Sequence, residues 1–434
     1  MRAVWLTVMT VFTAGANRNL CQAEPPAVTT LPPSEATLPN GIEVSQPLSP
    51  VLLPVSDVPP FADPLRRVEE VREGGSRGQR GPLGPSWSVA EFLLWWPKAH
   101  PLPPLVTTAR LGPPPALGDP NGVVAVGGRA LAHPDVAGGR FILGCSLGDP
   151  QDRGAELVYF FLGSRTIRSA VTAIGNPRVA SIGLAYVDPR TGREEVFPAA
   201  APGVATGAVV VTATTRVQGA EGNLVANLLD TPGVQLNGLL GYRFLQVHEG
   251  VTLEQVRCAS GGCGPIYDEF DGHNRFHGGQ LGLQAGLSRG GVFLELTGKV
   301  ALGRTFEVVR IDGVTGFLVS GPAGSQTVTL PGGVYTSPAN IGRHTSTAFA
   351  VVPEGVLKVG LRFNQSGRLY VGYNLLYLSD AVRPGDQIDR NVNPANIAAL
   401  NPGGGYWPPD RPRPLLSRSD FWAQGLIIGL EARY

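Results

Sequence analysis

Apolar and polar positions alternate along most of the chain from residue 86 onward, which is the period of a β-strand with different surroundings on its two faces. Near the C-terminus, Leu426, Ile428 and Leu430 occupy one face, whereas Glu431 and Arg433 occupy the other. Comparable runs recur upstream, each of about nine to twelve residues, the length of a tilted strand that crosses a bilayer. The pattern predicts strands with lipid on one face and water on the other.

Two classes of all-β protein share this alternation, the soluble β-sandwich and the transmembrane β-barrel. Sandwich strands usually have about five or six residues, which is shorter than these runs. The apolar faces end in Trp and Tyr, as interface girdles do, and tight connections such as Ser288–Gly291 and Asn364–Gly367 alternate with long ones. We therefore predict an all-β fold, an antiparallel transmembrane β-barrel with long loops on one rim.

The number of strands follows from the runs and from parity, because an even number places both termini on the periplasmic side. We expect about twelve strands, within a range of about 10–14. They lie near residues 87–96, 139–147, 155–162, 206–217, 219–229, 234–246, 250–257, 278–288, 291–303, 355–363, 368–379 and 420–434. Tight turns are expected at 148–154, 218, 247–249, 288–291 and 364–367, and the other rim receives the long connections, including 258–277, and a short link at 230–233.

The amino-acid composition excludes several other classes. The 434 residues include 58 glycines and 40 prolines, and only 16% are charged, which is typical of a turn-rich chain with few helices. No run of about 18 apolar residues follows the N-terminus, so a helical membrane protein is excluded. The net charge of +1 gives no sign of nucleic-acid binding.

The first 85 residues differ from the rest of the chain. Residues 1–23 combine a basic start, an apolar run and small residues, which is typical of a secretory signal peptide, and the alternative is an apolar strand or helix. Residues 24–85 are rich in proline and glycine and predict a disordered periplasmic linker, which offers a contact with the cell wall. Residues 86–434 form the predicted barrel, which we expect in the bacterial outer membrane.

Few residues carry a catalytic or metal-binding pattern. His273 and His277 lie four apart in an acidic, glycine-rich stretch, where a metal site on a helix is one interpretation and a solvated or self-packed loop is the favoured one. Cys258 and Cys263 allow a disulfide, two free thiols or, least of all, a metal site. No HExxH motif occurs, and we expect no Gly-x-Ser-x-Gly elbow, the sharp strand-to-helix turn that presents a nucleophilic serine. We therefore expect no enzymatic activity, catalytic residue, cofactor or bound metal.

Charged residues on the inward face of the predicted strands are candidates for the lining of the lumen. They are Arg243, Glu295, Lys299, Lys358, Arg362, Glu431 and Arg433. A mixed-charge run after the strand at 368–379 contains Asp380, Arg383, Asp386, Asp389 and Arg390. This run is either a loop held by internal ion pairs or a constriction loop that folds into the lumen and sets selectivity.

The C-terminal segment carries a candidate insertion signal. It alternates, has Phe421 and Trp422 at its start and ends in the aromatic residue Tyr434. Such an ending resembles the signal by which insertion machinery captures barrel precursors through strand addition. The expected partners are outer-membrane lipid and this machinery, with no nucleic-acid partner, and the oligomeric state stays open.

Several ordered motifs resemble a known family. They are Glu91–Trp96, Gly241–Phe244, Asn274–Gln280, Lys299–Gly303, Val352–Glu354, Val382–Arg390 and Phe421–Gly425. These motifs are similar to those of the putative beta-barrel porin-7 family, from about residue 86 to the C-terminus, and the Pro-rich segment 24–85 lies outside the likeness. The resemblance implies a bacterial outer-membrane barrel, and it implies transport only by inference.

Two functions remain in competition at this point. The favoured one is a porin-like barrel that allows passive diffusion of small hydrophilic solutes or ions, because both charge signs on the inward face indicate a wet interior. The alternative is a closed structural or adhesive barrel that interacts with the cell wall or with surface partners. A barrel of about twelve strands has limited width, so loops can plug it.

Overall fold

The computed structural model describes residues 83–434 except 133, 148–151, 174–180, 260–261, 322–323 and 403–406. The predicted signal peptide and nearly all of the predicted linker lie outside the described residues. Within the described part, the helical turns are two short 3-10 segments, η1 (Pro384–Gln387) and η2 (Pro394–Asn396). No helix there has the length and hydropathy that a helical membrane crossing needs.

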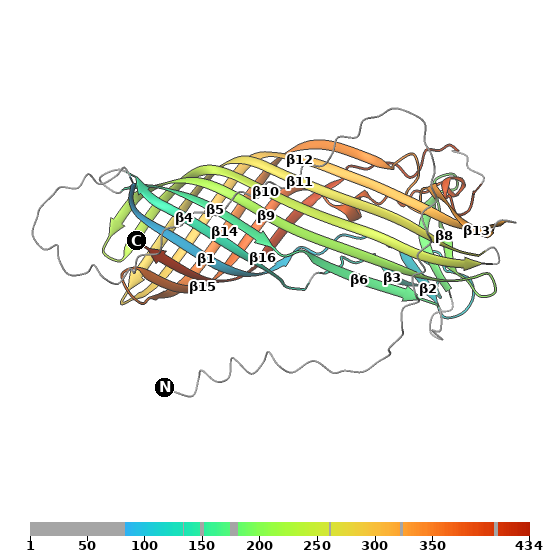
Figure 1. Cartoon of the computed structure of the whole chain (residues 1–434), viewed down its shortest axis with the longest axis horizontal. Coiled ribbons are helices and arrows are strands. Elements are labelled where there is room, and N and C mark those ends of the chain that lie inside the picture. The colour runs from blue at the N-terminus through green and yellow to red at the C-terminus, as the bar shows by residue number, and fades with distance from the viewer. Residues whose placement is uncertain are drawn as a thin grey trace, which may run out of the picture. The chain divides into compact units, whose positions relative to one another are not determined.

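Ten antiparallel strands pair in a closed ring, a β-barrel, as Figure 1 shows. In ring order they are β1 (Leu83–Pro97), β4 (Val136–Leu147), β5 (Arg153–Leu162), β9 (Ala205–Thr231), β10 (Val234–Ala259), β11 (Gly262–Arg289), β12 (Val292–Gly321), β14 (Gly342–Arg362), β15 (Gly367–Val382) and β16 (Arg418–Arg433). The last strand, β16, pairs with the first, from Trp87 with Arg433 to Pro97 with Ala423. A closed sheet satisfies its backbone hydrogen bonds internally, as a bilayer requires. The predicted fold class is confirmed.

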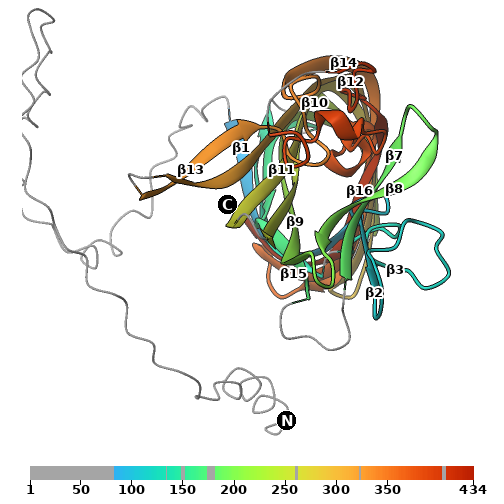
Figure 2. The same cartoon turned by 90° about the vertical axis from the view of Figure 1, so that its right-hand side faces the viewer.

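Two further strands bring the sheet to twelve. β6 (Arg165–Thr172) pairs with β9 just beyond the end of β5, and β13 (Gly324–Pro331) pairs with β12 as a hairpin. The long connections also build a separate four-stranded sheet, in the order β3 (Val123–Val126), β2 (Val106–Ala109), β7 (Ser181–Asp188) and β8 (Arg193–Ala200). Figure 2 shows these additions at the long-loop end of the barrel.

Some individual turns were placed wrongly by the alternation. The predicted strands at 206–217 and 219–229 are one strand, β9, and those at 234–246 and 250–257 are one strand, β10. Gln218 pairs with Gln246 and Val217 with Val247, so residues 218 and 247–249 lie within a continuous ladder. The stretch 258–277 is not a long connection, because it belongs almost wholly to the β10–β11 hairpin.

The connections sort onto two rims. Short turns join β9 to β10, β11 to β12 and β14 to β15, and both described chain ends share that rim. The turn predicted at 148–154 lies mostly outside the described residues. The β9–β10 and β11–β12 turns contain Gly233, Gly290 and Gly291 with φ values of 88°, 58° and 86°, which glycine adopts without strain. The link at 230–233 therefore belongs to the short-turn rim and not to the opposite one. We call the two parts of the barrel the short-turn half and the long-loop half.

The outward face of the short-turn half is apolar. Leu296 on β12 is 57% exposed, whereas its neighbour Thr297 points inward and is 9% exposed. Leu283 on β11 and Leu430 on β16 are likewise exposed. Every strand of the ring has exposed apolar side chains, mostly leucines, with Phe92 and Trp96 on β1. Because such side chains are unfavourable in water and favourable in lipid, this face defines the membrane-spanning band. The predicted register of the C-terminal strand and of β12 is correct.

The long-loop half reverses the polarity of the two faces. On β9, Val211 and Ala213 point inward and are fully buried, whereas Arg216 points outward and is exposed. On β11, Phe270 is buried and Arg275 is exposed. Inward residues of β9, β10, β11 and β12 pack there against residues of the connections, among them Leu105, Ile182, Leu184, Tyr335, Ile388, Val392 and Ile397. This half therefore has an apolar core and a polar exterior.

Candidate functional site in the barrel lumen

Four acid–base pairs face the lumen from neighbouring strands. The ladders place Glu91 opposite Arg140, Glu221 opposite Arg243, Lys299 opposite Glu354, and Lys358 opposite Glu295. Directly opposed side chains on one face of a sheet lie within contact distance of each other. Strand register thus supplies an opposite charge beside each of these eight groups, and the set is electrically balanced.

Ion pairs also cross the lumen between strands that are not neighbours in the ring. Glu354 on β14 lies 3.0 Å from Arg140 on β4 and also contacts Arg243 on β10. Lys358 on β14 lies 3.0 Å from Glu91 on β1. Because these contacts join separate walls directly, charged side chains fill the cross-section at this level.

The network is buried, and aromatic rings pack on it. Arg243 is 1% exposed. The Arg140 guanidinium lies 5.5 Å from the ring centre of Trp95 and 5.6 Å from that of Phe160. Tyr370 donates a hydrogen bond of 2.6 Å to Glu91. Ionisable groups at membrane depth usually face the protein interior and pair with each other, as they do here.

The mixed-charge run after β15 folds into the long-loop half. Arg383 donates two hydrogen bonds of 2.8 Å to Glu249 on β10, and both side chains are fully buried. The backbone of Val382 exchanges two hydrogen bonds with the inward side chain of Asn274 on β11. The run therefore contacts the lumen wall and is not held by internal pairs alone. Its effect on selectivity remains a prediction.

The other charged residues of this run have mixed partners. Asp380 accepts a hydrogen bond from Ser379, Asp386 from Ser419 and Asp389 from Arg411, and Arg390 donates to Glu194 on β8. Three of these contacts stay within the connection between β15 and β16 or at the strand ends beside it, and the contact of Arg390 with Glu194 ties the connection to the four-stranded sheet. The connection thus holds several elements of the long-loop end together.

A chain of three polar side chains lies beneath Arg383. The Thr215 hydroxyl is 2.8 Å from Nε2 of His100, and Nδ1 of His100 is 3.6 Å from Glu249. Burial lowers the pKa of His100, so its imidazole is neutral at neutral pH. The order hydroxyl, imidazole, carboxylate is that of a hydrolase triad. The side chains of His100 and Glu249 are fully buried, however, so a substrate has no open approach to them in this conformation.

The segment before β14 also folds onto the lumen wall. Asp268 on β11 accepts hydrogen bonds from the backbone amides of Val334 and Tyr335, at 3.1 and 3.0 Å, and from the Thr336 hydroxyl at 2.7 Å. Tyr335 in turn donates to two backbone carbonyls of the other long connections. Burial raises the pKa of the Tyr335 hydroxyl, which therefore stays a donor. These contacts fix the position of the inward-folded segment.

A polar cavity of about 420 Å³ opens at the short-turn end of the lumen. It is lined by groups of both charge signs, including Glu295, Lys358, Arg368, Glu431 and Arg433, and by Gln235, Asn237 and Gln284. The inner end of this vestibule is formed by Lys358, which belongs to the cross-lumen network. The vestibule is a polar cavity, and the wet interior that the alternating charges indicate stays a prediction.

The structure brings most of the predicted lumen residues together in two groups. Arg243, Lys299, Lys358 and Glu295 belong to the network, whereas Glu431 pairs with Arg433 at the short-turn rim, 2.6 Å apart. Arg362 has an inward position at that rim and is exposed. Their role in selecting ions stays a prediction.

Sequence reasoning missed four residues of the network. They are Glu91, Arg140, Glu221 and Glu354. Glu91 and Glu354 stand in motifs that were noted only for their resemblance to a family, and Glu221 lies next to a misplaced turn. A search for charges at inward positions opposite each other would have found all four once the register was known.

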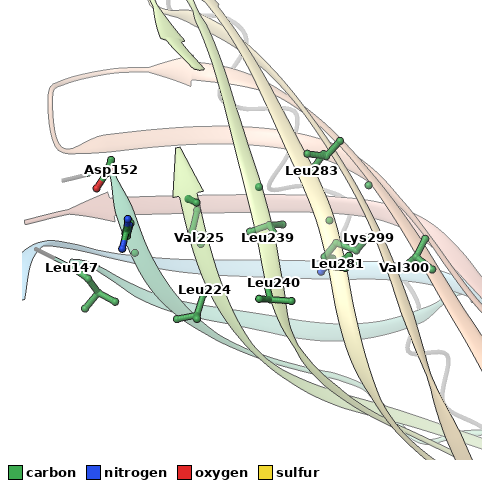
Figure 3. A pocket seen from close by; sticks show the side chains of 16 residues that line it. Leu147, Asp152, Leu224, Val225, Leu239, Leu240, Leu281, Leu283, Lys299 and Val300 are labelled. Carbon is green, nitrogen blue, oxygen red and sulfur yellow. The ribbon is translucent and has the colours of Figure 1, made fainter. Parts of the chain in front are cut away.

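The lipid-facing wall has a large hollow, which Figure 3 shows over β5, β9, β10, β11 and β12. Its volume is about 1300 Å³. Exposed leucines such as Leu240, Leu281 and Leu283 line it, and the glycines Gly238 and Gly298 leave space between them. The charged residues Asp152, Arg153 and Lys299 also belong to its lining.

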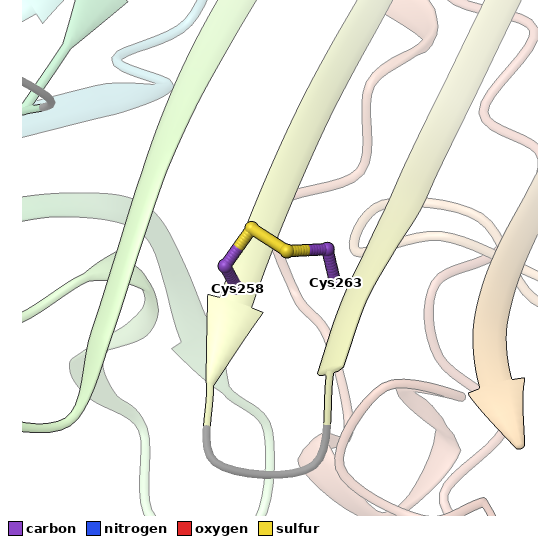
Figure 4. Close-up of a disulfide and its surroundings, with 2 residues drawn as sticks. All are labelled: Cys258 and Cys263. Carbon is purple, nitrogen blue, oxygen red and sulfur yellow. A yellow bond between two sulfur atoms is a disulfide. The ribbon is translucent and has the colours of Figure 1, made fainter. Parts of the chain in front are cut away.

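The hairpin of β10 and β11 settles two questions that the sequence left open. Cys258 and Cys263 are opposite each other near its tip and form a disulfide, shown in Figure 4. His273 and His277 lie on β11 and not in a loop, so the loop interpretation of this stretch is wrong. The acidic and glycine residues around them alternate between the inward and outward faces.

This geometry defines an outer-membrane β-barrel with ion pairs across its lumen and connections packed inside its long-loop half. The chain belongs to the family described as Putative beta barrel porin-7, whose model matches residues 87–434. No curated protein matches the sequence significantly.

Two solved structures are similar only in outline. The outer-membrane protease OmpT of Escherichia coli has 10% identity and a TM-score of 0.40, covering 82% of this chain and 98% of its own. A FadL homologue of Pseudomonas aeruginosa has 8% identity and a TM-score of 0.20, covering 81% and 90%.

The comparison with OmpT corrects the expectation that this chain is not an enzyme. The solved barrels with a similar outline include a protease. The likeness is too distant to transfer an activity or a site to this chain. The spacing Gly-x-Ser-x-Gly does occur, at Gly286–Gly290, but it lies at the end of β11 and in the tight turn before β12, not between a strand and a helix.

Proposed function

We propose that this protein is a closed structural barrel of the outer membrane, whose long-loop half is a platform for surface partners. The observation that carries the proposal is the cross-lumen network, in which Glu354 contacts Arg140 and Arg243 on other walls. A solute that passed this level would have to separate buried ion pairs. Leaving one buried charge without its partner costs about 3–5 kcal/mol.

The packing on the long-loop side of the network supports the same function. Val392, Ile388 and Tyr335 belong to connections that fold inward and pack with the buried faces of β9, β10 and β11. Removing them from the lumen would expose a contiguous apolar core to water, at about 25 cal/mol for each Å². The closed state is therefore stabilised by apolar burial in addition to ion pairs.

Lipid and insertion machinery are the partners that we propose for the membrane-spanning half. Hydrocarbon chains fit the exposed leucines and the hollow lined by Leu240 and Leu281. The C-terminal strand ends with Tyr434, which is 73% exposed and hydrogen-bonds through its backbone to Ser86 on β1. This exposed aromatic end is available for capture before the ring closes.

Passive diffusion of small hydrophilic solutes is the second candidate, and the polar vestibule favours it. The vestibule admits water to Lys358 from the short-turn end. Diffusion through the barrel then requires that the network and the inward-folded connections separate. In this case the network acts as a gate and not as a permanent plug.

Planar-bilayer recording separates the two candidates. The closed barrel predicts no steady conductance for the native protein. Arg243→Ala should also stay silent if the packed connections suffice to close the lumen, whereas a gated channel should open more often once this cross-lumen contact is lost. A steady ohmic conductance of the native protein, at ordinary voltages and dependent on its concentration, would overturn the proposal.

A further inference from the structure

The outer wall of the β10–β11 hairpin carries two histidines and one aspartate in contact. His248 and His273 are directly opposite in the ladder, and their ring centres are 3.8 Å apart. Asp271 lies two residues before His273 and therefore on the same face. One of its carboxylate oxygens is 2.9 Å from Nε2 of His248, and the other is 3.5 Å from Nε2 of His273. Both imidazoles thus present the same nitrogen to one carboxylate.

We propose that His248, Asp271 and His273 form a binding site for a divalent transition-metal cation of the zinc class. Two imidazole nitrogens and one carboxylate oxygen are ligands that zinc takes, and three protein ligands leave a fourth position for water or an anion. The ligand atoms lie within 4.8 Å of one another. Zinc bonds of about 2.0 Å in a tetrahedron separate ligand atoms by about 3.3 Å. Small side-chain rotations on a fixed ladder are sufficient to close this difference.

The site lies beyond the lipid-facing band. Along the outward face of β11, Leu281 is followed toward the long-loop rim by His277, which contacts Tyr242, and then by Arg275 and His273. An aromatic residue followed by charged ones marks the edge of the hydrocarbon layer. The side chains of His248, Asp271 and His273 are 32%, 23% and 29% exposed, so a hydrated cation can reach them.

The surroundings set the expected strength of binding. Arg216 is opposite His248 in the ladder, and Arg275 lies two residues beyond His273 on the same face. Both positive charges oppose a cation. In addition, Nδ1 of His273 has no hydrogen-bond partner among the described residues, whereas the outer nitrogen of a metal-bound histidine usually has one. We therefore expect weaker binding than in structural zinc sites, and tighter binding, by about threefold, after Arg216→Gln.

Calorimetric titration of the tag-free, full-length protein in detergent with zinc chloride tests the site. The native protein should bind one zinc ion per chain at this cluster. His273→Ala and Asp271→Asn should each weaken binding at least about tenfold, because each removes one of three ligands. His277→Ala is the matched control, since it removes an outward histidine from the same strand and should leave the affinity unchanged. Cobalt added in place of zinc should give the intense visible absorption of a tetrahedral site.

Thermal unfolding keeps the test independent of folding defects. Without metal, Asp271→Asn should unfold at the temperature of the native protein, because the site is on the surface. Zinc should raise the midpoint of the native protein and of His277→Ala, since a ligand of the folded state stabilises it, and should not raise that of Asp271→Asn. Absence of zinc binding by the native protein would overturn the proposal. Equal binding by the native protein and a His248→Ala/His273→Ala double variant would overturn it as well.

Discussion

The two halves of the barrel are built from the same strands with opposite polarity. In the short-turn half, Leu283 faces outward and Gln284 lines the vestibule. In the long-loop half of the neighbouring strand, Leu253 is buried inside and Thr252 points outward. The change of phase occurs at the edge of the lipid-facing band, where the outward leucines are followed first by aromatic and histidine residues and then by charged ones. One ladder can therefore face lipid along one part and water along another, provided that the alternation of apolar and polar residues shifts by one residue between the two parts.

The contents of the two halves follow from this shift. Where lipid covers the outside, polar residues must go inside, and there the register pairs them as buried ions. Where water covers the outside, apolar residues go inside, and the connections fold in to complete an ordinary protein core. The pattern therefore places side chains and connections inside the lumen in both halves, although different forces hold them there.

The largest expected effect comes from breaking the ion network of the short-turn half. Arg243→Ala leaves Glu221 and Glu354 facing each other with fewer cations, although Lys299 still contacts both. We expect a loss of about 3–5 kcal/mol in the free energy of unfolding. Arg433→Ala is the control, because that half-exposed ion pair at the rim should contribute about 1 kcal/mol or less. Denaturant unfolding followed by tryptophan fluorescence measures both, and equal losses would contradict a special role of the network.

The core of the long-loop half predicts the next effect. Leu253→Ala removes a fully buried side chain, and such changes cost about 2–5 kcal/mol. Thr252→Ala changes the adjacent outward position and should alter stability by about 0.5 kcal/mol or less. The same denaturation experiment applies. A larger loss for Thr252→Ala than for Leu253→Ala would show that the polarity does not reverse here.

On the lipid-facing wall, the outward position should be the sensitive one when arginine is introduced, and the inward position should tolerate it. Leu283→Arg places a charge on the lipid side, which costs about 2–4 kcal/mol near the bilayer midplane. Gln284→Arg places the same charge in the wet vestibule, and we expect a cost of about 1 kcal/mol or less, the loss of its hydrogen bond with Asn237. Folding into lipid vesicles compares them, and indistinguishable stabilities would contradict the assigned membrane band.

Sequence reasoning predicted the membrane-spanning part well and the long-loop part poorly. The C-terminal strand and residues 292–303 of β12 carry a long alternation of one phase, so the outward positions of Leu296 and Leu430 could be read directly. At residues 218 and 247–249 the alternation changes phase, and a change of phase looks like a turn when one environment is assumed for the whole strand. The connections could not be predicted because their folding depends on contacts with distant strands, such as that of Arg383 with Glu249.

The lumen site, too, could be predicted only in part from the sequence. Inward charges such as Arg243 and Lys299 follow from alternation alone. Their partners across the lumen depend on the ring order and the shear of the sheet, which a single sequence does not contain. The partner of His273, in contrast, could be predicted from the sequence. Pairing Cys258 with Cys263 sets the register of the hairpin. Ten residues before Cys258 and ten residues after Cys263, this register places His248 opposite His273.

The disulfide at the hairpin tip predicts the smallest effect and tests how separate the two halves are. Replacing both Cys258 and Cys263 by serine removes a covalent link across a sequence separation of 5 residues. Closing a loop this short is worth about 2 kcal/mol by chain entropy. The tip lies far along the ladder from the lipid-facing leucines, so the loss should appear as local opening and not as unfolding of the membrane band. Limited proteolysis and hydrogen exchange should show faster attack near residues 255–266 and unchanged protection around Leu283. Faster exchange throughout β10 and β11, including the lipid-facing part, would mean that the hairpin opens as one cooperative unit and that the two halves are not energetically separate.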